Sequence, residues 1–254
     1  MNAAIFTAWQ PSAVREQMSE EVFQSRIRCA LEFVENALRV TEKVVVVTDD
    51  YSSALLQDSR ARVVCTTKRG AGITRRMALA AAVELLTKDE PGALLWCEPE
   101  KVSVPLFLNV LTKPVLGGLC DVLILKRESL TSYPRWQQPW EEAGSAMFGE
   151  LIGRVGFDYF FGPRVLGQEA AKIFLRYPND CSVDDEWDAI HAPLADCVAR
   201  GLRFGEKVVP FVYPEIQKVS EDHDLQMVER RSLQLFKIIS QTASYVQQRN
   251  RQLA

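Results

Sequence analysis

Apolar residues in the first half of the chain alternate between short continuous runs and longer stretches with helical spacing. The short runs, rich in aliphatic side chains, lie at residues 5–9, 43–50, 61–65, 93–97 and 120–125. Stretches with helical spacing lie at about residues 19–38 and 74–86, and another begins near Pro105. Short buried strands that alternate with helices are typical of an open, mostly parallel sheet covered by helices. The pattern therefore predicts an α/β fold.

The alternation is lost beyond residue 128. Residues 129–140 are rich in Pro, Trp and Gln without a period, which predicts a loop over the sheet. Helices are predicted near 142–153, 166–176 and 195–200, and a last strand at 208–213. A long helical segment or hairpin follows from about residue 224, with an apolar face of Leu225, Val228, Leu235, Phe236, Ile239 and Val246. We expect this face to pack on its own domain, with a dimer contact as the alternative.

The composition is that of an ordinary globular protein, with 47% hydrophobic and 25% charged residues. The net charge of −3 and the absence of a long Lys or Arg run argue against nucleic acid or an anionic membrane as the main partner. The six cysteines form no C-x-x-C pair, so reduced thiols are expected rather than a zinc cluster. The N-terminus lacks a signal-peptide pattern, and no window is long and apolar enough for a transmembrane segment. We expect a cytoplasmic protein.

An acidic tripeptide, Glu98-Pro99-Glu100, ends the predicted strand at residues 93–97. Pro99 favours an extended backbone at Glu98, and residues two apart in an extended chain share a face. Both carboxylates can therefore point at one cation, and ligands of open α/β sheets bind at the carboxyl ends of the strands. Carboxylate oxygens suit Mg²⁺ or Mn²⁺, which in turn bind a diphosphate. The alternative is a pair of solvated acids.

Two other segments suggest contacts to a nucleotide. Asp49 and Asp50 end the strand at 43–50, where they can bind a base or ribose, or cap the next helix; Ser52 or Ser53 is the favoured cap. Residues 68–72, Lys-Arg-Gly-Ala-Gly, precede a helix whose backbone N–H groups could face phosphate oxygens. Neither a Walker loop nor a G-x-G-x-x-G fingerprint is present there.

Acid–base and further metal-ligand candidates come later in the chain. Asp184, Asp185 and Glu186, beside Trp187, are the best candidates for a general base, and a solvated helix start is the alternative. His223 follows the last predicted strand in a polar segment. It could supply a third ligand to the metal, or it is a surface histidine.

In this order, the segments resemble the GT-A glycosyltransferases, especially family 2-type enzymes and their mannosylglycerate-synthase-like relatives. Residues 44–53 resemble the strand and DDGS segment that holds the nucleoside, residues 68–80 the Gly-rich turn and helix beside the diphosphate, and residues 94–101 the D-x-D metal motif. Residues 120–128 resemble the following strand, residues 157–175 the acceptor-side segment, and residues 184–187 the segment of the catalytic acids.

The resemblance implies an open, mostly parallel sheet flanked by helices, with a GT-A domain over residues 1–224 and a helical extension over 225–254. It implies a nucleotide-sugar half at about 1–127 and an acceptor half at 128–224. The implied donor is a UDP- or GDP-sugar and the acceptor an unknown hydroxyl compound. The implied donor-binding residues are Thr7, Asp49, Asp50, Lys68, Arg69 and Gly70; the ligands of Mn²⁺ or Mg²⁺ are Glu98, Glu100 and His223; and the catalytic residues are Asp184, Asp185 and Glu186.

The chain departs from the family pattern at two places. Glutamates replace the aspartates of the metal motif, which leaves metal identity and metal dependence open, and Tyr51 replaces the DDGS glycine. One alternative is a non-catalytic GT-A domain that serves binding or assembly. A sugar-1-phosphate nucleotidyltransferase is disfavoured because residues 9–12, Trp-Gln-Pro-Ser, stand where that class has a Gly-rich loop.

Overall fold

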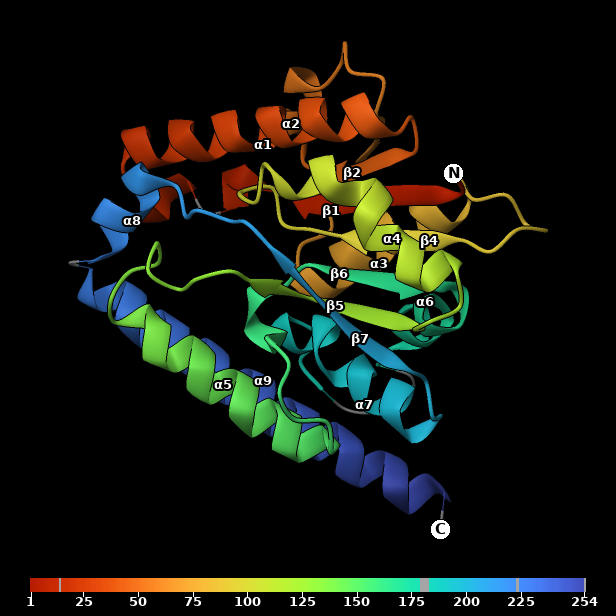
Figure 1. The fold of residues 1–254 in the computed structure, drawn as a ribbon. Helices are drawn as coiled ribbons and strands as arrows, with labels where there is room; N and C mark the ends of the chain where they lie inside the picture. The colour runs from red at the N-terminus through yellow and green to blue at the C-terminus, as the bar shows by residue number, and fades with distance from the viewer. Residues whose placement is uncertain (14, 179–182, 223, 254) are drawn as a thin grey trace.

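The computed structural model describes residues 1–13, 15–178, 183–222 and 224–253. Their centre is a seven-stranded sheet with the strand order β3-β2-β1-β4-β6-β5-β7 (Figure 1). The strands are β1 (Ala3–Trp9), β2 (Val44–Thr48), β3 (Arg62–Cys65), β4 (Ala93–Trp96), β5 (Val122–Arg127), β6 (Arg164–Gly167) and β7 (Phe204–Val209). Strand β6 runs antiparallel to β4 and β5, and the other neighbouring pairs are parallel. The predicted mostly parallel α/β sheet is confirmed.

Helices cover both faces of the sheet. They are α1 (Glu20–Val40), α2 (Asp50–Leu55), α3 (Ala71–Val83), α4 (Leu108–Leu116), α5 (Gln137–Ile152), α6 (Gln168–Arg176), α7 (Ala192–Ala199), α8 (Glu215–Asp222) and α9 (Leu225–Leu253). Core side chains of α1 and α4 pack on one face, and those of α3, α6, α7 and α9 on the other. None of the helices in the described ranges has the length and apolar character needed to cross a bilayer.

Helix α1 shows how local sequence sets an element boundary. Ser19 accepts a hydrogen bond from the Val22 amide (3.3 Å), and Glu20 and Glu21 lie in the first turn, where they complement the helix dipole. Phe33, Val34 and Ala37 then pack against the sheet. The helix begins one residue after the predicted start.

Strand β6 is the main error of the sequence prediction, which placed a helix over 166–176. Residues 164–167 form a strand, and the helix starts only at Gln168. Four residues are too few to show a period of two. The alternation is nevertheless present, because Val165 packs on one face of the sheet and Leu166 on the other.

Three other boundaries differ from the prediction. Helix α5 begins at Gln137, so the loop after β5 is shorter than the predicted 129–140. Strand β7 ends at Val209, and Phe211 and Tyr213 are buried in the coil that follows. The C-terminal region is one long helix, α9, preceded by the short α8, and not a hairpin.

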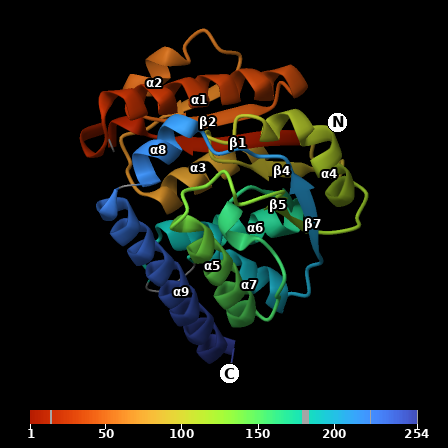
Figure 2. The same ribbon diagram turned by 60° about the vertical axis from the view of Figure 1, so that its left-hand side comes forward.

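Helix α9 lies along α5 and also contacts α7 (Figures 1 and 2). Its buried residues include Leu235, Ile238 and Tyr245, whereas Leu225 and Phe236, two members of the predicted apolar face, are 84% and 69% exposed. The helix therefore packs on its own domain through part of the predicted face, because Leu235 is buried and Ile239 and Val246 pack against the core.

Candidate active site

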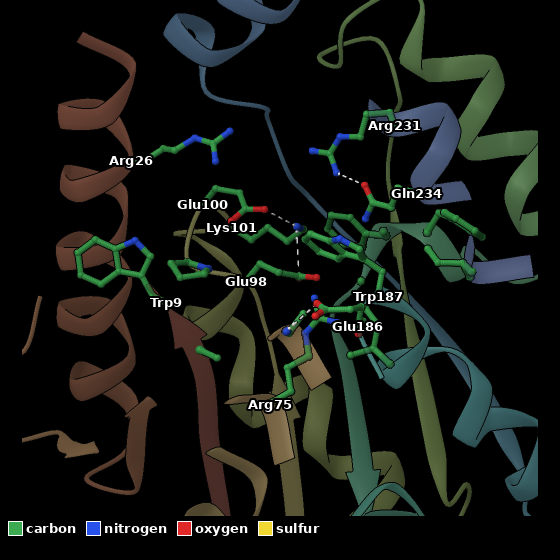
Figure 3. A pocket seen from close by; sticks show the side chains of 18 of the residues that line it. Trp9, Arg26, Arg75, Glu98, Glu100, Lys101, Glu186, Trp187, Arg231 and Gln234 are labelled. Carbon is green, nitrogen blue, oxygen red and sulfur yellow. Dashed lines mark hydrogen bonds and ion pairs between the residues drawn. The ribbon is translucent and has the colours of Figure 1, made fainter. Parts of the chain in front are cut away.

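A cavity of ≈ 500 Å³ opens at the carboxyl ends of β1 and β4 (Figure 3). Ligands of open α/β sheets bind at this edge. Its polar lining comes from segments far apart in the chain: Gln10 after β1, Arg26 of α1, Arg75 of α3, Glu98, Glu100 and Lys101 after β4, Glu141 of α5, Glu186, and Arg231 and Gln234 of α9. The cavity thus combines carboxylates with several fixed cations.

Glu98 and Glu100 both line the cavity, as expected, but a lysine lies between them. The Lys101 Nζ atom is 3.3 Å from Glu98 Oε2 and 3.1 Å from Glu100 Oε1. A turn hydrogen bond from the Lys101 amide to the Glu98 carbonyl (3.1 Å) folds the chain back and brings the three side chains together. Gly162, with φ of +97°, leaves room for the Glu98 carboxylate, since a Cβ there would come 2.3 Å from Glu98 Oε1.

The charges of this cluster stabilise one another. Burial acts to lower the pKa of Lys101, but the carboxylates of Glu100 and Glu98 outweigh it and raise that pKa well above its usual value. Burial likewise opposes ionisation of Glu100, and the Lys101 ammonium overcomes it, so the pKa of Glu100 is lowered. The lysine is therefore charged and the glutamate ionised at neutral pH.

This cluster does not fit a divalent metal. The third predicted ligand, His223, lies outside the described residues. Within the described ranges, no group of three or more His, Cys, Asp or Glu side chains is arranged to hold a metal ion. Glu98 and Glu100 supply two carboxylates, and both are already paired with an ammonium group.

The Gly-rich turn contacts the chain's own acidic segment. Gly70, with φ of +117°, precedes α3, and the first free amide of the helix, that of Ala71, donates to Glu186 Oε2 (3.0 Å). The Gly72 amide donates to the Asp185 carbonyl (3.1 Å). A Cβ at Gly72 would lie 2.1 Å from Asp185 Oδ1, so the glycine permits this contact. The amides that were expected to face phosphate oxygens are bound to residues 185 and 186.

The predicted catalytic acids occupy different environments. Asp184 is exposed, 3.7 Å from the Lys237 ammonium, and Asp185 forms a two-pronged ion pair with Arg76. Neither lines the cavity, whereas Glu186 does. The structure therefore leaves Glu186 as the acid of this trio that a bound substrate can meet.

A smaller cavity of ≈ 170 Å³ adjoins the carboxyl ends of β2 and β3. Its lining residues are Gln10, Ser12, Asp49, Asp50, Tyr51, Thr66, Thr67 and Arg69, and it shares Gln10 with the larger cavity.

Asp49 is the N-cap of α2, accepting from the Ser52 amide (3.0 Å), so the expectation of a serine cap is wrong. Asp49 also accepts from the Ser12 hydroxyl (2.6 Å). Burial opposes its ionisation, and these hydrogen bonds lower its pKa on balance.

Two predicted donor-binding residues line neither cavity. Thr7 is 1% exposed within β1 and lines neither of them. Lys68 also lines neither, and its backbone carbonyl accepts from Gln10 Nε2 (2.8 Å). Arg69 and Gly70 do reach a cavity, Arg69 the smaller and Gly70 the larger.

Arg75 is the most prominent site residue that sequence reasoning missed. The residue is 8% exposed, and its guanidinium lies between two indole rings, 5.3 Å from the Trp96 centroid and 4.9 Å from that of Trp187. It donates to the Glu186 backbone carbonyl (3.4 Å), which carries no full charge. Burial lowers the pKa of Arg75, and the nearby charges of Glu98 and Glu186 oppose that shift. The available signal was an arginine pair inside an otherwise apolar helix.

The C-terminal helices form a wall of the cavity, which was not expected either. Arg231 of α9 faces the cavity opposite Arg26 of α1, and it donates to Gln234 Oε1 (2.9 Å) (Figure 3). Arg26 pairs with Glu221 of α8 at 3.3 Å. The indole Nε1 of Trp136 donates to the Glu221 carbonyl (3.0 Å) and so ties α8 to the start of α5.

No protein-family model and no curated protein matches the sequence. Solved structures share the fold. Glucosyl-3-phosphoglycerate synthase from Mycobacterium tuberculosis, in complex with UDP, has a TM-score of 0.61 at 13% identity, covering 94% of this chain and 80% of that one. The same enzyme with Mn²⁺, UDP and glucosyl-3-phosphoglycerate gives 0.58 at 12% identity over the same shares of the two chains. A structure described only as that of a mycobacterial protein has a TM-score of 0.64 at 13% identity, covering 96% of this chain and 74% of that one. The fold is GT-A. That prediction is confirmed.

Proposed function

We propose that the protein transfers a sugar from a nucleoside diphosphate sugar to a hydroxyl group of an acceptor. The observation that carries the proposal is the pair of adjoining cavities at the carboxyl ends of β1 to β4, in a GT-A fold. The smaller cavity offers carboxylates and amide groups, which suit a nucleoside, and the larger offers buried cations, which suit a diphosphate.

The donor spans the two cavities through Gln10, the residue they share. Asp49 and Asp50 contact the base or ribose, and Arg75 contacts the diphosphate. UDP-sugars are the first donors to test, because the solved neighbours bind UDP. GDP-sugars are the second.

The transfer breaks the bond between the anomeric carbon and the diphosphate oxygen, and the electron pair stays on that oxygen. The acceptor oxygen forms the new bond to the anomeric carbon and loses its proton. Two groups can take this proton, the Glu186 carboxylate and the departing diphosphate. Fixed cations near the diphosphate stabilise the charge that develops on it. The anomeric form of the product decides between the two proton acceptors.

The acceptor binds on the side of α9. Arg231 and Arg26 present guanidinium groups to this part of the cavity, and planar guanidinium groups bind carboxylates and phosphates in two-pronged fashion. An acceptor that carries a carboxylate or phosphate therefore fits best. One solved neighbour binds such a compound, phosphoglyceric acid.

The proposal is tested by calorimetry against UDP, GDP and their sugars, followed by product detection with hydroxy acids and sugar phosphates as acceptors. Each assay is run with Mn²⁺, with Mg²⁺ and with EDTA. We expect binding of one nucleoside diphosphate and transfer from its sugar. Absence of binding to every nucleotide would contradict the proposal and favour the non-catalytic binding or assembly role.

A further inference from the structure

We infer that the Lys101 ammonium supplies the positive charge that a divalent metal was expected to supply at Glu98 and Glu100, so that donor binding and transfer need no metal ion. This inference rests on the proposed function.

The position of Lys101 is the first argument. Its Nζ atom lies within 3.3 Å of Glu98 Oε2 and 3.1 Å of Glu100 Oε1, which is between the two groups that would have to share a metal ion. A metal bound to both carboxylates would be brought close to the ammonium group, and like charges at that range repel strongly where water is scarce. One cation, and not two, fits this place.

The confinement of Lys101 is the second argument. The residue is only 6% exposed, and its ammonium lies 5.6 Å from the Phe161 ring centroid and 5.9 Å from that of Phe211. Its backbone is fixed too, because its amide donates to the Glu98 carbonyl and its carbonyl accepts from the Val104 amide, both at 3.1 Å. The side chain is therefore held in place and cannot easily move aside for a metal ion.

The ligand supply is the third argument. Mg²⁺ demands nearly octahedral oxygen coordination, and it usually binds through one or two carboxylates together with water and substrate phosphates. Both carboxylates here are already paired with the same ammonium group, which offsets part of their negative charge, and the described part of the chain offers no third acidic or imidazole group beside them. Lys101 lines the cavity, so its ammonium group is placed to contact a phosphate oxygen of a bound donor.

The chemistry required of this cation is electrostatic. When the bond to the anomeric carbon breaks, negative charge grows on the departing diphosphate, and a fixed positive group lowers the energy of that state. Lys101 and Arg75 both line the larger cavity, so the chain carries two such groups of its own. Both carboxylates of the tripeptide then act as positioning residues that hold the ammonium in place.

The first test uses the unaltered protein and measures metal binding directly. Free Mn²⁺ is followed by its electron paramagnetic resonance signal during titration with protein, with and without UDP, and UDP binding is measured by calorimetry in EDTA. We expect no stoichiometric loss of the Mn²⁺ signal, and UDP affinity that EDTA does not change. Stoichiometric Mn²⁺ binding that disappears in Glu98→Gln plus Glu100→Gln would overturn the inference.

The second test uses Lys101→Met, which keeps the length of the side chain and removes its charge, with Lys113→Met on the exposed face of α4 as the matched control. We expect Lys101→Met to lose transfer in EDTA on the order of 10²-fold or more, as for other single electrostatic groups at active sites. We also expect it to gain Mn²⁺ binding at the freed carboxylates. An unchanged rate in EDTA for Lys101→Met would contradict the inference.

The two proposals fail in different ways. If the protein binds no nucleotide under any condition, the proposed function fails, while the Mn²⁺ titration still decides which cation the tripeptide holds. If the protein binds UDP only with Mn²⁺, the proposed function stands and the role of Lys101 is wrong.

Discussion

The surroundings of Arg75 hold its guanidinium in place to bind an anion. Two indole rings flank its guanidinium, and its hydrogen-bond partner is a carbonyl oxygen. Burial without a directly paired carboxylate is costly for a cation, because the protein replaces only part of the lost hydration. A diphosphate would supply the missing negative charge, and the stacked rings already hold the guanidinium in position.

We therefore predict that Arg75→Met weakens binding of the nucleoside diphosphate. Hydrogen bonds to charged groups contribute about 1.5–3 kcal/mol, which corresponds to a loss of affinity of roughly 10- to 100-fold. Calorimetry with UDP measures the change, and Arg62→Met, which removes an exposed arginine paired with Glu84, is the control. Equal affinities for the two variants would show that Arg75 does not contact the diphosphate.

At Gly72 we predict whether replacement by alanine raises or lowers the stability of the protein. At an open helical position, replacement of glycine by alanine stabilises a protein by about 1 kcal/mol. Here the added Cβ would overlap Asp185, so we expect Gly72→Ala to destabilise by about 1–3 kcal/mol, the usual range for overpacking. Urea unfolding at neutral pH measures the difference. A stabilising substitution would mean that the segment at residues 184–186 is not packed against α3.

At the scale of elements, the contact between the start of α3 and residues 185–186 changes the meaning of the Gly-rich turn. A helix N-terminus favours negative charge, and phosphate is only one of the anions that can supply it. In this chain Glu186 does so, more than a hundred residues later in the sequence. The local sequence predicts that an anion binds at the turn, but it does not show whether that anion is a phosphate or a carboxylate of the chain itself.

The strands and helices differ in how strongly their local sequence marks them. Strands β1, β2, β4 and β5 each contain a run of apolar residues, and α1 has both a cap and a period, so local pattern suffices for them. Strand β6 has four residues, one of them the fully buried Arg164, whose guanidinium donates to the carbonyls of Gly162, Ile190 and Tyr159. A charged residue inside a short strand conceals the pattern, because its partners are set by tertiary structure.

For the candidate site, the positions of residues at strand ends could be predicted, but the contacts between their side chains could not. The strand-end position of Glu98, Glu100, Asp49 and Asp50 could be inferred, since parallel strands bring their carboxyl ends to one edge. The ion pair of Asp185 with Arg76 and the insertion of Lys101 between two glutamates depend on how loops fold back. Such contacts depend on side-chain geometry, which cannot be inferred from residue spacing or composition.

At the scale of the whole molecule, the cavity is assembled from both ends of the chain. Strands β1 and β4 form its floor, and α1 and α9 contribute facing cations, Arg26 and Arg231 (Figure 3). Helix α9 is thus part of the candidate site as well as part of the core. A homodimer through the C-terminal helices stays a prediction; Leu225, Leu233 and Phe236 are the exposed apolar residues of α9 that it would use.

The proposed acceptor side leads to a prediction that separates the two substrates. We expect Arg231→Gln to raise the KM for an anionic acceptor by about 10- to 100-fold, the range expected when a hydrogen bond to a charged group is lost. The affinity for the nucleoside diphosphate should not change, because Asp49, Asp50 and Arg69 line the smaller cavity at the other end of the site. Initial rates at varied acceptor concentration and calorimetry with UDP measure the two effects.

Arg230→Gln is the matched control, because Arg230 precedes Arg231 on α9 but is exposed and lines neither cavity. It should alter neither the acceptor KM nor the UDP affinity. If Arg231→Gln instead weakens UDP binding and leaves the acceptor KM unchanged, the donor reaches α9 and the orientation proposed for the two substrates is reversed. If both values change together, the substitution has disturbed the packing of α9, and circular dichroism and the unfolding midpoint should show it.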